Sequence, residues 1–386
     1  MKIKSEQFRK YARLLNNAYV RGNRVTESFY LDLKNSCIYF KTDNYLGHMP
    51  FGLEKEDGEN IKNLFVDIPV FMALCNEYDE ITLQEKTVKG INEESKEYDT
   101  QIEVIFSNDT EEFQIPFFRE TSESEDFDIE KFNYKSKENW EQFSLSEEFM
   151  NEIKLSAFYI GPDDFMGRNL SGVSIHPDSI VSTDGSKIFE SMIESSFKTA
   201  IPNYATKLIS LGVAMNLPVN FCKSKNLENL MIVYGHGEYS LILPEITDLY
   251  SPDLKDPKFM KAFKHDTSIV IDREEFLGVL QFFEPLVRDV KNQMLMLSIK
   301  NQKTLSIETK EDTIGNRNVD LVECSSELVN SGELWFARQD LVLGLTSILD
   351  EQIRIEINFS EEAQAFYMEG VTNKNRHIIV VKLKTE

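Results

Sequence analysis

The chain has 386 residues, of which 65 are Asp or Glu and 42 are Lys or Arg, so its formal net charge is -23. A surface this acidic excludes adsorption to nucleic acid or to anionic membranes through its average charge. Apolar residues make up 41% of the chain and aromatic residues 11%, which excludes a disordered acidic tail. The length predicts two or three folded domains.

The cysteine content and the absence of targeting signals both indicate a cytoplasmic protein. Cys37, Cys75, Cys222 and Cys324 lie far apart, with no CxxC pair, so a zinc ribbon and a dithiol redox motif are excluded. The N-terminal stretch lacks the apolar core of a signal peptide, and no window approaches the roughly 18 apolar residues of a membrane span. We expect a soluble cytoplasmic protein with reduced thiols, without a membrane partner, metal or cofactor.

Charge is unevenly distributed along the chain. Residues 1–24 contain seven basic side chains against Glu6, a local net charge of +6, which leaves -29 for the remainder. Residues 111–130 contain eight acids against Arg119. The first segment indicates a basic element in an acidic protein, and the second indicates an acidic interdomain linker at about 119–141.

The first third of the chain reads as helix, paired strands, helix and further strands. An amphipathic helix is predicted at about 5–18, with Phe8, Tyr11, Ala12 and Leu15 on one face. Alternating strands follow, then a second helix and three more strands. These segments are 28–35, 37–44, 66–79, 80–86, 100–106 and 111–118.

The same order restarts at residue 143. Ser144, three residues before Glu147, has capping-box spacing and predicts a helix over 144–160. A strand pair, a helix with Pro202 near its first position, and three closing strands follow, with Gly235-His236-Gly237 as a hairpin turn. The ranges are 171–178, 179–191, 200–213, 219–224, 230–235 and 239–245.

A third round opens at Asp272, a predicted cap with Glu275 in the capping-box position. Its helix covers 273–286, and the later elements are 294–301, 304–312, 333–350, 353–360, 363–370 and 376–384. Equivalent helices start roughly 125 to 140 residues apart, which indicates an internal triplication. We therefore predict an α+β fold of three similar domains at 1–141, 142–266 and 267–386.

Several segments resemble one family. The stretch VSTDGSKIFES, with a helix ahead of it and AIPNYATKLISL after it, resembles the middle domain of the bacterial DNA polymerase III beta subunit, the sliding clamp. RHIIVVKLK resembles the terminal strand of that family, LWFARQDLVLGLTSIL resembles the second helix of its third domain, and MKIKSEQFRKYARLLNNAYVRGNR resembles its first helix and loop. The resemblance covers essentially the whole chain.

The chain also departs from the family pattern. Ser186, Lys187 and Ile188 follow Gly185 where the family usually has His-Arg-Leu, and Lys384, Thr385 and Glu386 extend beyond the usual last apolar residues. The acidic linker is longer than usual. These differences indicate a divergent member, of the kind that a phage or plasmid encodes.

The resemblance implies three tandem DNA-clamp domains, with helices on one face and antiparallel sheets on the other, and two copies joined head to tail as a ring. Such a homodimer encircles double-stranded DNA without reading its sequence, so basic residues are expected on the inner helices. Arg9 and Arg13 share a helix face and Arg24 follows in the loop. The candidates for DNA contact are Arg9, Arg13, Arg24, Lys154, Lys207, Arg273 and Arg338. An ordinary solvated helix face is the alternative for each of them.

The resemblance also implies a pocket for the short hydrophobic peptides of a DNA polymerase and a clamp loader. Ile378 and Val380 are two residues apart and therefore share one face of a strand, as a pocket wall requires. The residues carried over to this pocket are Leu170, Thr183, Gly185, Ile188, Ile378 and Val380. The alternative is that they are core or edge-strand residues.

An enzymatic reading rests on His176, Asp178 and Asp184, which lie close in sequence and could form a metal or acid–base site. Pro177 and Asp178 are typical of a hairpin turn, and the chain has no GxSxG, HExxH or P-loop motif.

Three functions therefore remain from the sequence. The leading hypothesis is a non-catalytic DNA sliding clamp, a processivity factor that tethers a replicative polymerase. The alternative is a clamp-fold interaction protein that binds replication proteins without encircling DNA. The third hypothesis is an unrelated α+β hydrolase.

Overall fold

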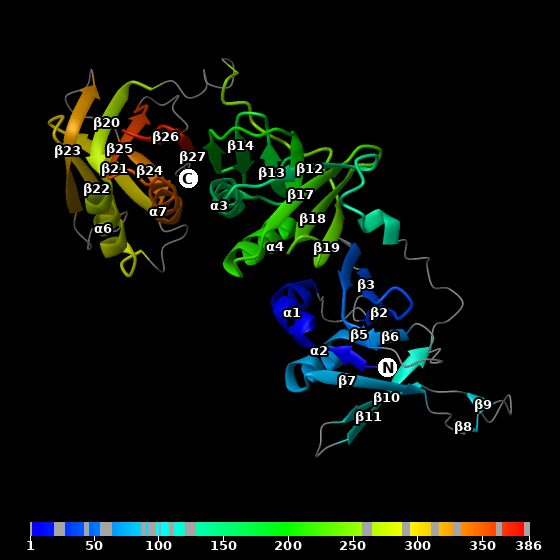
Figure 1. Cartoon of the computed structure of the whole chain (residues 1–386). Helices are drawn as coiled ribbons and strands as arrows, with labels where there is room; N and C mark the ends of the chain where they lie inside the picture. The colour runs from blue at the N-terminus through cyan, green and yellow to red at the C-terminus, as the bar shows by residue number, and fades with distance from the viewer. Residues whose placement is uncertain are drawn as a thin grey trace. The chain divides into compact units, whose positions relative to one another are not determined.

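The chain of this computed structural model, whose helices and strands are labelled in Figure 1, divides into two compact units, which we describe separately. One unit consists of Met1–Met150 with Lys207–Glu245, and the other of Asn151–Thr206 with Ile246–Glu386. No helix among the described residues is long and apolar enough to cross a bilayer. The described residues are 2–18, 28–41, 46–54, 64–85, 90–91, 98–99, 102–107, 112–119, 129–256, 265–287, 294–309, 316–326, 333–359 and 365–381.

The first unit is built on a 13-stranded sheet in the order β12-β17-β18-β19-β4-β3-β2-β6-β11-β10-β7-β1-β5. Its strands are β1 Lys2–Lys4, β2 Ser28–Asp32, β3 Cys37–Lys41, β4 Leu46–Pro50, β5 Leu53–Glu54, β6 Leu64–Asp67, β7 Glu80–Glu85, β10 Ile102–Ser107, β11 Glu112–Arg119, β12 Trp140–Ser144, β17 Val219–Ser224, β18 Asn229–Tyr234 and β19 Tyr239–Pro244. β8 Gly90–Ile91 pairs with β9 Tyr98–Asp99. The helices are α1 Glu6–Ala18, α2 Ile68–Glu77 and the 3-10 helix η2 Ile129–Phe132.

The second unit is built on a 12-stranded sheet in the order β16-β13-β14-β15-β27-β26-β25-β20-β23-β22-β21-β24. Its strands are β13 Gly172–Ile175, β14 Ile180–Thr183, β15 Lys187–Ser191, β16 Thr199–Pro202, β20 Thr267–Asp272, β21 Met294–Lys300, β22 Thr304–Thr309, β23 Asn316–Ser326, β24 Leu334–Ala337, β25 Gln352–Ile357, β26 Ala365–Gly370 and β27 Arg376–Val381. It also contains the 3-10 helix η3 Ala157–Tyr159, α6 Arg273–Phe283 and α7 Arg338–Ser347. α3 Glu147–Ser156 and α4 Asn203–Ala214 contribute residues to both units.

One order of elements occurs three times along the chain. The first repeat is β1-α1-β2-β3-β4-β6-α2-β7-β10-β11, the second is β12-α3-β13-β14-β15-β16-α4-β17-β18-β19, and the third is β20-α6-β21-β22-β23-β24-α7-β25-β26-β27. The strand pairs recur as well: β2 pairs with β6 as β13 pairs with β16 and β21 with β24. The domain boundaries given above stay a prediction.

Consecutive repeats are joined by strand pairing of one kind. β19, the last strand of the second repeat, pairs antiparallel with β4 of the first, where Leu241 lies opposite Gly47. β27, the last strand of the third repeat, pairs with β15 of the second, where Ile379 lies opposite Ile188. Each repeat contains three consecutive strands joined by hairpins, β2-β3-β4 in the first repeat and β13-β14-β15 in the second; we call the last of these the third hairpin strand. At both junctions, the last strand of one repeat pairs with the third hairpin strand of the repeat before it.

Each unit has an aromatic and aliphatic core between its helices and its sheet. In the first unit, Phe8 of α1 packs edge-on against Phe71 of α2, with ring centroids 4.9 Å apart. In the second unit, Phe276 of α6 and Leu341 of α7 lie in one buried cluster with residues of β27. Burial of these apolar faces supplies the main driving force for folding.

Two predicted helix starts have different outcomes. The prediction at Asp272 is confirmed, because its Oδ1 accepts a hydrogen bond of 2.8 Å from the Glu275 backbone N–H. The cap predicted at Ser144 is wrong, since Ser144 ends β12 and Ser146 Oγ accepts from the Phe149 N–H at 3.1 Å. Both serines lie near the start of the helix, but Ser144 belongs to the paired strand β12, so Ser146 caps the helix instead.

The predicted acidic linker falls partly outside the described residues, at 120–128. Its later part is folded: Phe132 of η2 is buried and stacks on His48 with ring centroids 4.9 Å apart. Burial lowers the pKa of His48 to about 4. Trp140, inside the predicted linker, is a buried residue of β12.

Candidate functional site

The basic residues predicted to face DNA from the first repeat lie on α1. Arg9 makes an ion pair with Asp79, at 2.6 Å between Nη2 and Oδ1, and its side chain stays 36% exposed. Arg13 is exposed. Arg24 lies outside the described residues. α1 therefore carries an exposed basic face, part of which is neutralised by Asp79.

The four later candidates fall into two classes. Lys154 on α3 and Lys207 on α4 are exposed. Arg273 donates to the Ile348 carbonyl at 2.7 Å and pairs with Glu274. The side chain of Arg338 is only 7% exposed and lies 3.5 Å from Glu284. Arg273 and Arg338 are thus committed to contacts inside the third repeat.

The helices are close to neutral as a set. The six α-helices of the described residues carry seven basic side chains, Arg9, Lys10, Arg13, Lys154, Lys207, Arg273 and Arg338, and eight acidic ones, Glu6, Glu77, Glu147, Glu148, Glu152, Glu274, Glu275 and Asp340. The whole chain has 42 basic and 65 acidic residues, so the helices are less acidic than the average. They still provide no strongly basic surface.

The strand residues Ile188 and Ile378, both predicted to line the peptide pocket, lie on opposite faces of one sheet. Ile188 lies opposite Ile379, whereas Ile378 lies opposite Phe189. Because directly paired residues point to the same side, Ile188 and Ile378 point to opposite sides. Ile378 and Val380 are fully buried in the core cluster beside α7, where a Cβ on Gly344 would lie 3.2 Å from Ile378 Cγ2.

Thr183 and Gly185 shape the turn between β14 and β15. Thr183 Oγ1 donates to the Lys187 carbonyl at 2.8 Å and accepts from the Gly185 N–H at 3.1 Å. Gly185 has a φ of +88°, and a Cβ there would lie 2.4 Å from the Phe165 ring. Glycine is therefore required both by the backbone conformation and by the covering ring. Leu170 is also buried, at 2% exposure.

A charged cluster links this turn to α7. Lys187 pairs with Asp184 and, at 3.1 Å, with Asp340, and all three side chains are at most 20% exposed. Burial lowers the pKa of Lys187, but hydrogen bonds and charges from Asp184 and Asp340 outweigh it, so the net pKa is raised. Lys187 therefore remains charged and ties β15 to α7.

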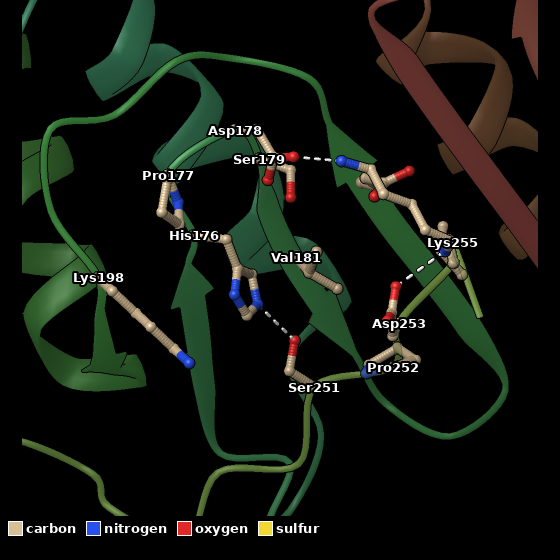
Figure 2. A pocket seen from close by; sticks show the side chains of 12 residues that line it. His176, Pro177, Asp178, Ser179, Val181, Lys198, Ser251, Pro252, Asp253 and Lys255 are labelled. Carbon is tan, nitrogen blue, oxygen red and sulfur yellow. Dashed lines mark hydrogen bonds and ion pairs between the residues drawn. The ribbon is translucent and has the colours of Figure 1, made fainter.

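A hollow of about 380 Å³ lies on the other side of this sheet (Figure 2). His176 donates to or accepts from Ser251 Oγ at 2.9 Å, and Asp178 pairs with Lys255. Burial, helped by the charge of Lys198, lowers the pKa of His176. Leu254 borders this hollow and also packs in an apolar cluster with Val181, Ile188, Ala365 and Ile379.

The three residues on which the enzymatic reading rests do not assemble into one site there. His176 and Asp178 each bind a residue of the 251–256 loop, and Asp184 binds Lys187. Among the described residues, no group of three His, Cys, Asp or Glu side chains could hold a metal ion. The arrangement can fix the loop on the sheet, and it brings no pair of these groups together for proton transfer.

Two contacts that the sequence did not indicate reinforce the junctions between repeats. At the first junction, Glu238, just before β19, accepts hydrogen bonds from Lys10 and from the Tyr11 hydroxyl of α1. At the second, Arg376, which begins β27, binds both carboxylate oxygens of Glu152 on α3 at 2.5 to 3.2 Å. Both link a helix of one repeat to the last strand of the next.

The fold can be compared with solved structures over its full length. No protein-family model matches the chain, and no curated protein is significantly similar to it in sequence. The DNA polymerase III beta chain of Streptococcus pneumoniae TIGR4 and the DNA polymerase sliding clamp of Bacillus subtilis each match with a TM-score of 0.74 at 12% identity, covering 100% of this chain and 99% of theirs. A putative DNA polymerase III beta subunit from Eubacterium rectale ATCC 33656 matches with a TM-score of 0.72 at 14% identity over 100% of both chains.

These matches confirm the expected α+β fold with antiparallel sheets, and their identities show that the sequence has diverged far from those of the solved structures. The chain therefore has, along its whole length, the fold of the bacterial DNA polymerase III beta subunits, the sliding clamps.

Proposed function

We propose that this protein is a DNA sliding clamp, a non-catalytic processivity factor that encircles duplex DNA in the cytoplasm as a head-to-tail homodimer. The observation that carries the proposal is the pairing rule at the two junctions. The last strand of a repeat pairs with the third hairpin strand of the preceding repeat, as β19 does with β4 and as β27 does with β15. Applied once more, the rule joins β11 of one copy to β23 of another.

Both of these strands have backbone available for such a junction. Glu112–Phe117 of β11 pair only with β10, and Asn316–Asp320 of β23 pair only with β22, as far as the described residues extend. An exposed strand edge is a template for pairing with another chain. Head-to-tail pairing at both ends would close two copies into a ring of six repeats.

The polymerase and the clamp loader would each bind through a short apolar peptide to the sheet face that carries Ile188. This face supports the proposal better than Ile378 and Val380, because its cluster with Ile379 includes Leu254 of the 251–256 loop, whereas Ile378 and Val380 are buried in the core cluster beside α7. Leu254 demonstrates that a leucine side chain fits against the cluster.

A second function is favoured by the charge of the helices. Seven basic against eight acidic side chains give little attraction for phosphates, which suits a clamp-fold protein that binds replication proteins without encircling DNA. Such a protein needs no closed ring.

Light scattering combined with small-angle X-ray scattering separates the two functions. For a clamp we expect a particle of about 89 kDa, twice the 44.7 kDa chain, with the scattering profile of a hollow disc. A ring should also stay on closed circular DNA in high salt and leave after linearisation. A chain that is monomeric at every concentration, with and without DNA, would contradict the ring.

Lys154 and Lys207 are the best placed of the predicted DNA contacts outside α1, because both are exposed. The double variant Lys154→Glu/Lys207→Glu should weaken binding to duplex DNA and lower the slope of log affinity against log salt by about 2. Fluorescence anisotropy over a salt series measures both quantities.

The matched control for that experiment carries the same charge change away from the helices. Lys135 and Lys303 are also exposed, and Lys303 lies in the turn between β21 and β22. The variant Lys135→Glu/Lys303→Glu should leave the salt slope near that of the native chain. Equal losses in both double variants would assign the effect to net charge alone.

A further inference from the structure

A flat ring covers one sheet face at the first junction between repeats. Leu46 and His48 of β4 point to this face, and Leu46 lies opposite Ile242 of β19. Phe132, the last residue of η2, lies in an apolar cluster against which Leu46 and Ile242 pack, and its ring centroid is 4.9 Å from that of His48. Phe132 is only 5% exposed. The segment that follows the first repeat therefore fills this part of the face.

The second junction has the same positions but a smaller cover. Glu190 lies opposite the second residue of β27, as His48 lies opposite the second residue of β19, and Ile188 likewise takes the place of Leu46. The segment after the second repeat contributes Leu254, which lies in one apolar cluster with Ile188. A leucine side chain is smaller than a phenylalanine ring, and a hollow of about 380 Å³ lies beside Leu254 and Glu190. The second junction thus has a hollow at the position that a ring covers at the first.

Glu190 brings a buried carboxylate to the lining of this hollow. Its side chain is only 5% exposed, and its Oε2 lies 2.7 Å from Nδ1 of His377, which fixes the carboxylate in place. A carboxylate has two oxygens with about four acceptor sites, so this single contact leaves capacity for a further donor. A donor that reaches the hollow can therefore bind Glu190 without displacing His377.

The charged groups that line the hollow favour a cation (Figure 2). Three are acids and two are lysines: Asp178, Glu190, Asp253, Lys198 and Lys255. Lys255 is paired with Asp178. His176 also lines the hollow, but burial and the charge of Lys198 lower its pKa, so its ring is uncharged at neutral pH. The lining therefore has an excess of one negative charge.

We propose that this hollow binds the basic side chain, arginine or lysine, of a partner peptide whose leucine packs on the apolar cluster around Ile188. This subsite rests on the proposed binding of partner peptides and names a second group that they carry. The planar guanidinium of an arginine would take the position that corresponds to the ring of Phe132 and would bind the carboxylate of Glu190. Leu254 and Val181 border both the cluster and the hollow, so one short peptide can reach both.

Selection from a peptide library tests the subsite on the full-length chain. The probe is a phage library of nonapeptides with leucine fixed at the centre and random residues elsewhere, beside a second library with alanine at the centre. We expect binders from the leucine library only, with arginine or lysine enriched at one position relative to the leucine. Glu190→Gln should abolish that enrichment and still yield binders from the leucine library.

Affinity measurements on a selected peptide separate charge from shape. Replacing its arginine with citrulline, or its lysine with acetyllysine, removes the charge, so the Kd for the native chain should rise about tenfold. The same replacement should change the Kd for Glu190→Gln by less than about twofold, because the counterion is already missing. Fluorescence anisotropy measures each Kd. The comparison of the two peptides on the native chain needs no variant that could alter folding.

Glu308 provides the matched control. It lies on β22 of the same unit, away from the hollow, and pairs with Lys300. Glu308→Gln removes one negative charge, as Glu190→Gln does, and should change neither the enrichment of basic residues nor the Kd of the selected peptide. An equal loss in both variants would assign the effect to net charge and overturn the subsite.

The outcomes separate the subsite from the binding of peptides to this face. Equal selection from the leucine and alanine libraries overturns both. Leucine-dependent binders that lack a basic residue, or that carry an aromatic residue in its place, overturn the subsite and leave the binding of apolar peptides standing. Enrichment that survives Glu190→Gln, or a citrulline peptide that binds the native chain as tightly, overturns the role of Glu190 as the counterion.

Discussion

Replacing Ile378 with Asp is expected to unfold the second unit, at a cost of more than about 5 kcal/mol in the free energy of unfolding. The side chain is fully buried in the core cluster with Leu341 and Leu345 of α7. Aspartate would remove the apolar packing and bury a carboxylate without a partner. That loss is comparable to the whole stability of a typical domain.

Fluorescence can report on this unit alone, because the chain has only two tryptophans. Trp140 lies in the first unit and Trp335 in the second. In a Trp140→Phe background, a urea titration followed by tryptophan emission measures the unit that contains Ile378. The control is Leu349→Asp, at a side chain 70% exposed in the same unit, which should change stability by less than about 0.5 kcal/mol.

The same substitution bears on the docking of partners. If Ile378→Asp left the midpoint and the emission spectrum unchanged but abolished polymerase stimulation, Ile378 would be a docking residue and its burial between sheet and helix would be contradicted. Loss of stimulation together with loss of the folded signal would reflect unfolding only.

Arg376→Ala should be the second large effect, at about 3 to 5 kcal/mol. Arg376 binds both oxygens of Glu152 and donates from Nη1 to the Ser347 carbonyl at 2.7 Å. The side chain of Glu152 is only 5% exposed, so removal of the guanidinium leaves a buried carboxylate without its counterion. The Trp335 signal again measures the unit concerned.

Removing both charges separates the effect of the ion pair between Glu152 and Arg376 from a general loss of packing. The double variant Glu152→Leu/Arg376→Met should be clearly more stable than Arg376→Ala, because no buried charge is left unpaired. A double variant as unstable as the sum of the single changes would mean that the two side chains are not coupled.

Most of the element order could be predicted from the sequence, because hydrophobic period is a local property. The helix at about 5–18 corresponds to α1, and the predicted strands at 28–35 and 37–44 contain β2 and β3. β23 was missed, although it is one of the longest strands. Asn316, Asn318 and Asp320 are polar and Val322 is 53% exposed, so the segment lacks a clear apolar alternation.

The register of the strands and the choice of pairing partner could not be predicted from local sequence patterns. That Ile378 and Val380 share a face followed from spacing, but which face meets the core depends on the pairing of Ile188 with Ile379, between segments 191 residues apart in sequence. The same holds for Arg338, whose charge suggested a DNA contact although its side chain is buried near Glu284.

The different side chains at the two internal junctions bear on how such a chain can evolve after triplication. The first uses Lys10 and Tyr11 against Glu238, and the second uses Glu152 against Arg376, with the charges reversed. A second repeat inserted in place of the first would set Glu152 against Glu238, two carboxylates at one contact. The first two repeats are therefore not interchangeable at this contact, and we expect a chain in which the second repeat replaces the first to be destabilised there by repulsion between the two carboxylates.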